Sequence, residues 1–255
     1  MKHVLGVIGG SGIYEIPGLE LVEEHRIETP FGAPSDAVVR ARHGDAEVLF
    51  LPRHGRGHRT PPHQINYRAN IAALKLLGAT HVVSLSAVGS MKEEIVPGHV
   101  VIVDQYIDLT KRRVSTFFDQ DVAAHVAFGD PVCADLAQAL TTAARRAGGT
   151  VHVGGTYVCM EGPQFSTRAE SHLYRAWGCD VVGMTNLQEA KLAREAGFDH
   201  VDGHRSLCLV VSPYTKRGAV VSKFYNQTSV LHTMERMLGL PPMNQMDSLA
   251  PLMSD

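Results

Sequence analysis

The sequence predicts an α/β protein, and two observations carry that prediction. Short apolar runs alternate with stretches in which apolar residues recur at helical spacing, which is the order typical of α/β proteins. Polar or glycine-rich residues directly follow several of the apolar runs. The 255 residues can bury a substantial core as one domain, and the hydrophobic content of 44% and charged content of 20% are those of an ordinary globular protein.

The N-terminal half is predicted to contain strands separated by a helix. The predicted strands are Val4–Ile8, Val48–Leu51, His81–Ser86 and Val100–Val103. Between the second and third of them, Ala69, Ala73 and Leu76 recur at helical spacing, which predicts a helix over Tyr67–Leu77. Gly78 supplies the stop signal for that helix.

In the C-terminal half, helix starts are predicted from capping signals. Asp130 followed by Pro131 predicts the start of a helix that Gly148 and Gly149 end. The sequence Thr167-Arg168-Ala169-Glu170 predicts a capping box and a helix through Trp177, and Thr185 to Gln188 predicts a second box with a helix to about Ala196. Strands are predicted at Val151–Val158 and Asp180–Gly183.

Composition excludes several classes of function. The net charge of -2 and the lack of a basic run argue against a nucleic-acid partner. No run of 18 apolar residues exists, so we expect no membrane span, and the apolar N-terminus meets glycines too soon for a signal peptide. The cysteines lack CxxC spacing and predict buried free thiols in a reducing cytoplasm; they are Cys133, Cys159, Cys179 and Cys208.

Four polar clusters follow predicted strands, and ligands of α/β sheets bind at the carboxyl ends of strands. The clusters hold Ser11 in Gly9–Gly12, Arg53-His54, Ser86-Ala87 and Thr185. A glycine loop, an arginine fork and a helix N-terminus all suit an anion such as phosphate. Each also has a simpler interpretation: a tight turn for Gly9–Gly12, a solvated basic loop for Arg53, and a helix cap for Thr185, which the local sequence favours.

Six segments together carry a resemblance to a known family. They are Gly9–Gly12, Thr29–Gly32, Arg53–Gly55, Asn66–Asn70, Glu161–Glu170 and Gly183–Asn186, with the sequences GGSG, TPFG, RHG, NYRAN, EGPQFSTRAE and GMTN. In order and approximate spacing they resemble the purine nucleoside phosphorylases, over about residues 1–198. Phe165-Ser166-Thr167 favours the methylthioadenosine phosphorylase branch, because the related enzymes for 6-oxopurines tend to carry Phe-Glu-Thr there.

The resemblance implies a fold, a site and a reaction. The fold would be a central mixed β-sheet flanked by helices, in a cytoplasmic homotrimer. Phosphate would be bound by Ser11, Arg53, His54, Ser86, the backbone at Ala87, and Thr185. The nucleoside would be bound by Met184 under the ribose, by Phe165 and Ser166 beside the purine, and by His125 from a neighbouring subunit. A surface histidine before a helix is an equally good interpretation of His125.

The implied reaction needs no metal and no organic cofactor, since inorganic phosphate is a co-substrate. The glycosidic bond stretches to a ribosyl cation-like transition state, which a phosphate dianion below C1′ stabilises and then captures. Preorganised phosphate donors would supply much of the rate. The substrate would be 5′-methylthioadenosine or a related purine nucleoside.

The resemblance ends near residue 198, so residues 199–255 form a divergent segment expected to pack on the same domain. Where the family has a strand ending in adenine-binding aspartates, residues 207–216 read LCLVVSPYTK: the strand is kept but the aspartates are absent, and the catalytic acid is therefore unknown. Segments at Asp199–Ser206, Ser212–Gly218 and Phe224–Ser229 resemble the C-terminal part of alkaline-phosphatase-superfamily phosphoesterases. His200 and His204 are more simply surface histidines than a metal site.

Three alternatives follow from that break. The first is a phosphorylase with shifted base preference, for example towards methylthioinosine. The second is a catalytically impaired chain that folds and assembles without competent base recognition. The third is a metal-dependent phosphoesterase, which the missing core of that enzyme disfavours.

Overall fold

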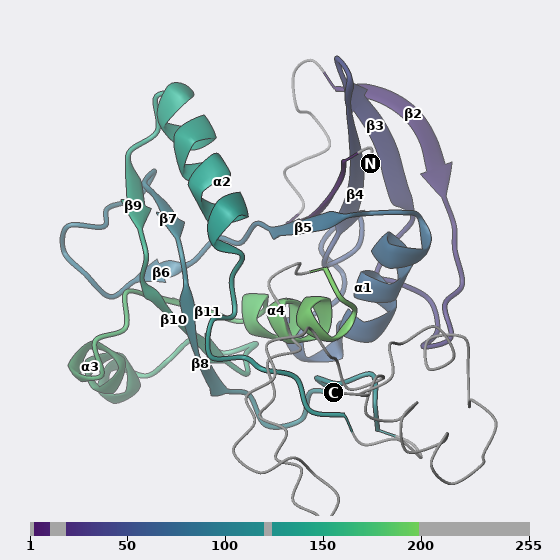
Figure 1. Cartoon of the computed structure of the whole chain (residues 1–255). Helices are drawn as coiled ribbons and strands as arrows, with labels where there is room; N and C mark the ends of the chain where they lie inside the picture. The colour runs from purple at the N-terminus through teal and green to yellow at the C-terminus, as the bar shows by residue number, and fades with distance from the viewer. Residues whose placement is uncertain (1–2, 11–18, 120–123, 199–255) are drawn as a thin grey trace, which may run out of the picture. The chain divides into compact units, whose positions relative to one another are not determined.

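The structure is a computed structural model that describes residues 3–10, 19–119 and 124–198. Ser11 and the segment 199–255 therefore lie outside the described residues, and so do the predictions made for them. Figure 1 shows helices interspersed among runs of strands along the described chain, as in an α/β fold. The predicted fold class is confirmed.

The first sheet has five strands and is mixed (Figure 1). Its order is β2 (Glu20–His25), β3 (Val38–His43), β4 (Ala46–Pro52), β1 (Val4–Gly9) and β5 (His81–Ser84). β1 pairs in parallel with β4 and β5, with Ile8 opposite Leu51 on one side and Ser84 on the other. β3 runs antiparallel to both of its neighbours. The carboxyl ends of β1, β4 and β5 consequently meet at one edge of the sheet.

The remaining strands form two smaller sheets. One has the order β6 (Gly89–Ser90), β11 (Val181–Gly183), β10 (Thr156–Met160) and β8 (Gln105–Leu109), and the other pairs β7 (Val100–Ile102) with β9 (Val151–Val153). The prediction of one continuous strand over Val151–Val158 was wrong. Gly154 and Gly155 both have positive φ, a conformation that interrupts the strand between β9 and β10.

The main core lies between the five-stranded sheet and two helices. α1 (Tyr67–Leu76) packs against α4 (Asn186–Glu195), and α4 also contacts β5. Fully buried apolar side chains from the strands and helices meet there: Ile8, Leu49, Leu51, Ile71, Leu74 and Leu192. Each such side chain contributes about 1.5–3 kcal/mol by leaving water. This core fixes α4 beside the ends of β1, β4 and β5.

The helix starts show where the capping signals hold. α3 (Arg168–Ala176) begins with the predicted capping box, since the Thr167 and Glu170 side chains each accept from the other residue's backbone N–H. α2 (Ala134–Arg146) begins after Cys133, so the start predicted at Asp130 was wrong. There the Asp130 carbonyl accepts a hydrogen bond from Arg194 instead of opening a helix. A short 3-10 helix, η1 (Pro62–Gln64), precedes α1.

The described cysteines are free thiols: Cys159 and Cys179 are buried and Cys133 is half-buried. Burial raises the pKa of the Cys159 thiol to about 12, so it is protonated at neutral pH. Among the described residues no helix is long and apolar enough to cross a membrane.

Candidate nucleoside phosphorylase site

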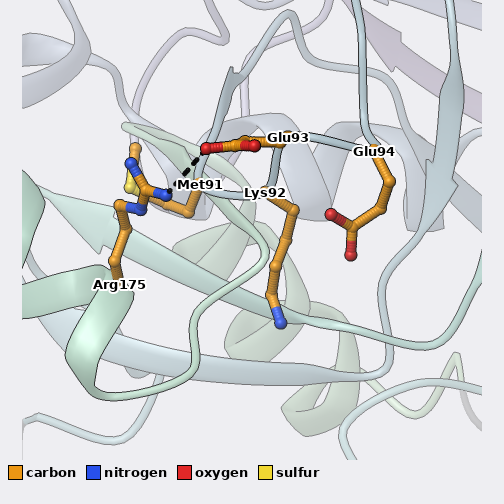
Figure 2. A pocket seen from close by; sticks show the side chains of 5 residues that line it. All are labelled: Met91, Lys92, Glu93, Glu94 and Arg175. Carbon is orange, nitrogen blue, oxygen red and sulfur yellow. Dashed lines mark ion pairs between the residues drawn. The ribbon is translucent and has the colours of Figure 1, made fainter.

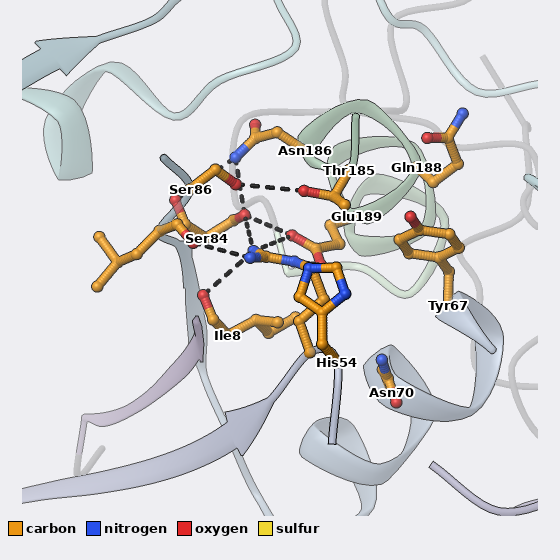
Figure 3. A network of polar contacts seen from close by, with 12 residues as sticks. Ile8, His54, Tyr67, Asn70, Ser84, Ser86, Thr185, Asn186, Gln188 and Glu189 are labelled. Carbon is orange, nitrogen blue, oxygen red and sulfur yellow. Dashed lines mark hydrogen bonds and ion pairs between the residues drawn. The ribbon is translucent and has the colours of Figure 1, made fainter. Parts of the chain in front are cut away.

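Polar residues from three separate segments meet where β1, β4 and β5 end (Figure 3). β4 leads into Arg53 and His54, β5 ends at Ser84 and leads into Ser86, and Thr185 precedes α4. The structure therefore brings together five of the six residues predicted for phosphate, because Ala87 follows Ser86 directly and only Ser11 is outside the described residues. Their binding of phosphate stays a prediction.

Arg53 lies at the centre of this cluster and is only 2% exposed. Its Nε donates to Glu189 Oε1 at 2.5 Å and its Nη2 donates to Glu189 Oε2 at 2.9 Å. Nη2 also donates to Ser84 Oγ at 2.8 Å, and Nη1 donates to the Leu85 carbonyl at 2.8 Å. Burial lowers the pKa of the guanidinium, but the Glu189 carboxylate outweighs it and keeps the pKa above its ordinary value. Arg53 is thus a fixed cation.

Thr185 occupies the N-cap position of α4, but its side chain does not cap the helix, although the local sequence favoured that role. Its side chain makes no capping hydrogen bond, and its hydroxyl lies 3.2 Å from the Ser86 hydroxyl. The predicted partner in the second capping box, Gln188, instead accepts from Arg113 and donates to Thr110. The second capping box was therefore wrong. Two hydroxyls are left side by side at the N-terminus of a ten-residue helix, where anions bind readily.

Tyr157 shapes the backbone before Thr185. Its phenol oxygen accepts from the Thr185 N–H at 3.4 Å, and a Cβ placed on Gly183 would lie 2.0 Å from that oxygen. No residue with a side chain fits at position 183 without displacing the buried Tyr157. Gly183 in the GMTN segment therefore serves close packing beneath the site.

His54 is half-buried beside Arg53 and is held in one tautomer. Its Nδ1 lies 2.8 Å from the Thr60 carbonyl, so Nδ1 carries the hydrogen and Nε2 is the acceptor in the neutral ring. Burial lowers the pKa of His54, and neighbouring His58 and Arg53 lower it further, against the opposing effect of the Thr60 hydrogen bond. The Nε2 of a neutral His54 can therefore accept a hydrogen bond from the P–OH group of hydrogen phosphate.

A wide groove opens over the loop that follows β10. It has a volume of about 1050 Å³ and is lined by residues of that loop, of α3 and of the segment after β8, among them Leu109, Arg112, Glu161, Phe165, Ser166 and Trp177. Phe165 is 85% exposed there. Both residues predicted beside the purine, Phe165 and Ser166, thus lie along one groove.

Met184 connects the groove with the phosphate cluster. It immediately precedes Thr185, and a Cβ placed on Gly162 would lie 2.6 Å from its sulfur. The loop that carries Phe165 therefore packs closely on Met184, and glycine at position 162, with φ of 69°, permits that approach. A sugar above Met184 would lie between the predicted phosphate and purine positions.

Arg113 is a residue that the sequence analysis missed. Its side chain is 1% exposed and donates to the carbonyls of Met184, Met160 and Glu161 and to Gln188 and the Tyr67 hydroxyl. It therefore ties the residue predicted under the ribose to the start of the purine loop. The run Lys111-Arg112-Arg113 resembles a solvated basic loop, and no local signal distinguishes its third member.

His125 is exposed and lies in an irregular segment. Its side chain makes no hydrogen bond to another described residue. Both of its interpretations, a contact to a neighbouring subunit and a surface histidine, remain open on this geometry.

A smaller pocket of about 300 Å³ has a different character (Figure 2). It is lined by Met91, Lys92, Glu93, Glu94 and Arg175, with Arg175 and Glu93 paired at 3.8 Å. Its charges are mixed and largely exposed, and none of its residues belongs to the predicted site. The described residues also contain no group of three or more His, Cys, Asp or Glu side chains suited to a metal ion.

The fold and this site define a phosphorylase. Residues 4–209 match the Phosphorylase superfamily, and the chain belongs to that family. It is 62% identical over 197 residues to S-methyl-5′-thioadenosine phosphorylase of Geobacter sulfurreducens, covering 77% of this chain and 69% of the relative. The corresponding protein of Hyperthermus butylicus is 52% identical over 197 residues, covering 77% of this chain and 72% of the relative.

Solved structures agree with the described fold. A methylthioadenosine phosphorylase from an Antarctic soil metagenomic library is 51% identical, with a TM-score of 0.73 over 75% of this chain and 68% of that one. Methylthioadenosine phosphorylase from Schistosoma mansoni is 40% identical, with a TM-score of 0.74 over 77% of each chain.

The second resemblance is also confirmed. Residues 180–241 match the Phosphoesterase family. This match overlaps the match to the Phosphorylase superfamily over residues 180–209. The predicted boundary at residue 199 falls inside this overlap. The described part of the overlap forms β11 and α4, which belong to the phosphorylase fold.

Proposed function

We propose that the chain cleaves 5′-methylthioadenosine with inorganic phosphate, releasing adenine and 5-methylthioribose 1-phosphate. The relatives named for this activity favour it over a shifted base preference, an impaired chain or a phosphoesterase. The structural observation that carries the proposal is the meeting of two hydroxyls, a buried arginine and a neutral histidine beside Met184 and an open groove.

Phosphate would occupy the cluster at the N-terminus of α4. The hydroxyls of Ser86 and Thr185 would donate to its oxygens, and backbone N–H groups at the helix start and at Ala87 would add further donors. Arg53 would contribute an N–H donor from Nη1, and His54 Nε2 would accept the P–OH hydrogen. These groups are already held in place by the core, so binding costs little reorganisation.

The nucleoside would lie along the groove with its ribose over Met184 and its purine beside Phe165 and Ser166. Stretching of the glycosidic bond would place positive charge on the ribose, facing the phosphate dianion. The dianion would then bond to C1′, and the pair of electrons from the broken C–N bond would leave with the purine, which takes up a proton. Alignment of both reactants supplies a large part of the rate.

The same proposal includes a cytoplasmic homotrimer that serves purine salvage without a metal or organic cofactor. Exposure of His125 supports a role in a neighbouring subunit's pocket, since nothing described in its own chain surrounds it. The predicted Ser11 donor would complete the phosphate site.

The test is purine release from a panel of 5′-methylthioadenosine, adenosine, methylthioinosine and inosine, with and without phosphate and a chelator. We expect release to require phosphate, to be fastest with 5′-methylthioadenosine and to be indifferent to the chelator. Release without phosphate would indicate a hydrolase. Phosphomonoester cleavage abolished by the chelator would indicate the phosphoesterase.

A further inference from the structure

Arg53 and Glu189 form an ion pair in which both side chains are almost completely buried, at 2% and 1% exposure. Their contact is bidentate, through Nε–Oε1 at 2.5 Å and Nη2–Oε2 at 2.9 Å. In every other ion pair of the described chain at least one partner is more than 20% exposed. Glu189 was not predicted as part of the site.

Stability alone does not account for such a pair. Removing two charges from water costs several kcal/mol for each ion, and replacing a buried pair by apolar residues is often neutral or stabilising. Here the chain adds further partners: Ser84 donates to Glu189 Oε2 and accepts from Arg53 Nη2 at 2.8 Å. The pair is therefore held in one geometry, which suggests that its position and charge serve the site.

The carboxylate limits what Arg53 can offer to an anion. Nε and Nη2 are directed at Glu189, Ser84 and the Ile8 carbonyl, and Nη1 donates once to the Leu85 carbonyl. One Nη1 hydrogen lacks a partner among the described residues. The Arg53 guanidinium, which was expected to bind phosphate, thus donates mainly to Glu189. The hydroxyls of Ser86 and Thr185 face each other nearby.

We propose that Glu189 is a positioning residue that fixes the Arg53 fork and cancels its charge beside the bound phosphate. The site then has little net charge and holds phosphate mainly through neutral donors, with one N–H from Arg53. A dianion bound in this way keeps its negative charge available to stabilise the ribosyl cation, and it dissociates readily. This inference rests on the proposed phosphorolysis of a nucleoside.

The test is steady-state kinetics and phosphate-induced stabilisation of Glu189→Gln in the full chain. Loss of one negative charge several Å from the anion, at an effective dielectric constant near 20, should lower the KM for phosphate about tenfold or more. The kcat should fall together with KM. Without the Glu189 charge, Arg53 neutralises the phosphate more strongly, and the phosphate then stabilises the ribosyl cation less. A purely structural role would lower kcat and leave KM unchanged or raised, which would overturn the proposal.

Two further variants keep the outcome interpretable. Glu47→Gln is the matched control, since Glu47 is also a buried carboxylate paired with an arginine, Arg40, and lies at the beginning of β4, whereas the site lies after the end of that strand. It should leave the KM for phosphate unchanged. In Arg53→Met/Glu189→Leu both charges are absent and an apolar pair can fold.

The double variant should raise the KM for phosphate by no more than about tenfold, which corresponds to the loss of the one Arg53 N–H donor, since the net charge is unaltered. A rise of about a hundredfold would mean that Arg53 is itself the main phosphate ligand and would refute charge cancellation. If the parent chain shows no phosphorolysis, the proposed function fails. The rise in melting temperature on adding phosphate still reports how tightly each variant binds phosphate. A larger rise in Glu189→Gln than in the parent would support the inference independently.

Discussion

The two halves of the site differ in how much of their geometry the described chain provides. On the phosphate side, Arg53, Thr185 and Glu189 are at most 5% exposed and are held by hydrogen bonds and by the core under α4. On the purine side, Phe165 is 85% exposed above a groove of about 1050 Å³. Among the described residues, the fold therefore preorganises the proposed phosphate side and leaves the proposed purine side open.

This difference teaches where substitutions should act. A change on the phosphate side disturbs buried charge and packing, so stability and catalysis should fall together. A change on the purine side removes a contact to the substrate alone, so the KM for the nucleoside should rise while stability is kept.

Arg53→Ala should lower kcat/KM for phosphate by about a hundredfold or more, the usual effect of losing one preorganised electrostatic group. It should also lower the free energy of unfolding by about 3–5 kcal/mol, because Glu189 is left as an unpaired buried charge. Kinetics and denaturant unfolding measure the two effects. Arg56→Ala, which removes an exposed pair with Glu24, is the control and should cost less than about 1 kcal/mol. Normal activity of Arg53→Ala would remove Arg53 from the site.

Thr185→Val should raise the KM for phosphate by about 10- to 150-fold, because it removes a hydrogen bond to a charged group worth about 1.5–3 kcal/mol. Thr185→Ser keeps the hydroxyl and should restore most of the affinity. Thr141→Val serves as the control, since Thr141 is similarly buried but donates to a helix carbonyl in α2. An unchanged KM in Thr185→Val would return Thr185 to a purely structural role.

Phe165→Ala should raise the KM for 5′-methylthioadenosine about tenfold, within the 1–3 kcal/mol that stacking of an aromatic ring on a base typically contributes. The free energy of unfolding should change by less than about 0.5 kcal/mol, as for other exposed positions. Leu76→Ala, another exposed apolar side chain, should change neither quantity. Parallel loss of stability in Phe165→Ala would contradict the open, substrate-facing position.

His125→Ala should raise the KM for the nucleoside about fivefold, equivalent to one contact of about 1 kcal/mol. If His125 acts in a neighbouring subunit, the specific activity of the parent chain should also fall when dilution dissociates the oligomer. Light scattering and activity measured over the same dilution series check this. A monomer with full activity would leave His125 as a surface residue.

His54 should give the smallest effect, a pH dependence of stability. Burial lowers the pKa of folded His54, so the unfolded chain binds this proton first as the pH falls. The parent should therefore lose stability between about pH 7.5 and about pH 5.5, the range around the ordinary histidine pKa of about 6.5. His54→Gln should lose less, as judged by melting temperature, whereas the exposed His43→Gln should match the parent. Equal pH dependence in all three would contradict a buried, neutral His54.

Several strands and helices that carry a clear apolar pattern or capping signal in their own sequence were predicted correctly. The buried strands β1 and β4, the helix α1 with its stop at Gly78, and the capping box at Thr167 lie where the pattern put them. β2 was missed because Glu20–His25 is polar and largely exposed, so it lacks the alternation of a half-buried strand. Its place in the sheet depends on pairing with β3, which no short window of sequence reveals.

The site followed the same division. The meeting of Arg53, His54, Ser86 and Thr185 could be predicted because polar residues that follow strands of an α/β protein converge at the carboxyl ends of those strands, while their binding of phosphate stays a prediction. Glu189 was missed because its partner lies 136 residues earlier in the chain, and a carboxylate in the first turn of a helix ordinarily faces solvent. Arg113 was missed for the same reason, since its partners come from α1, β10 and α4.

The most direct test of the central claim follows inorganic phosphate itself by phosphorus NMR, with the full chain and 5′-methylthioadenosine. We expect the phosphate signal to be replaced by that of a sugar 1-phosphate, one equivalent for each adenine released. Adenine released while inorganic phosphate stays unchanged would contradict it, because the preorganised cluster at the start of α4 would then not hold the nucleophile.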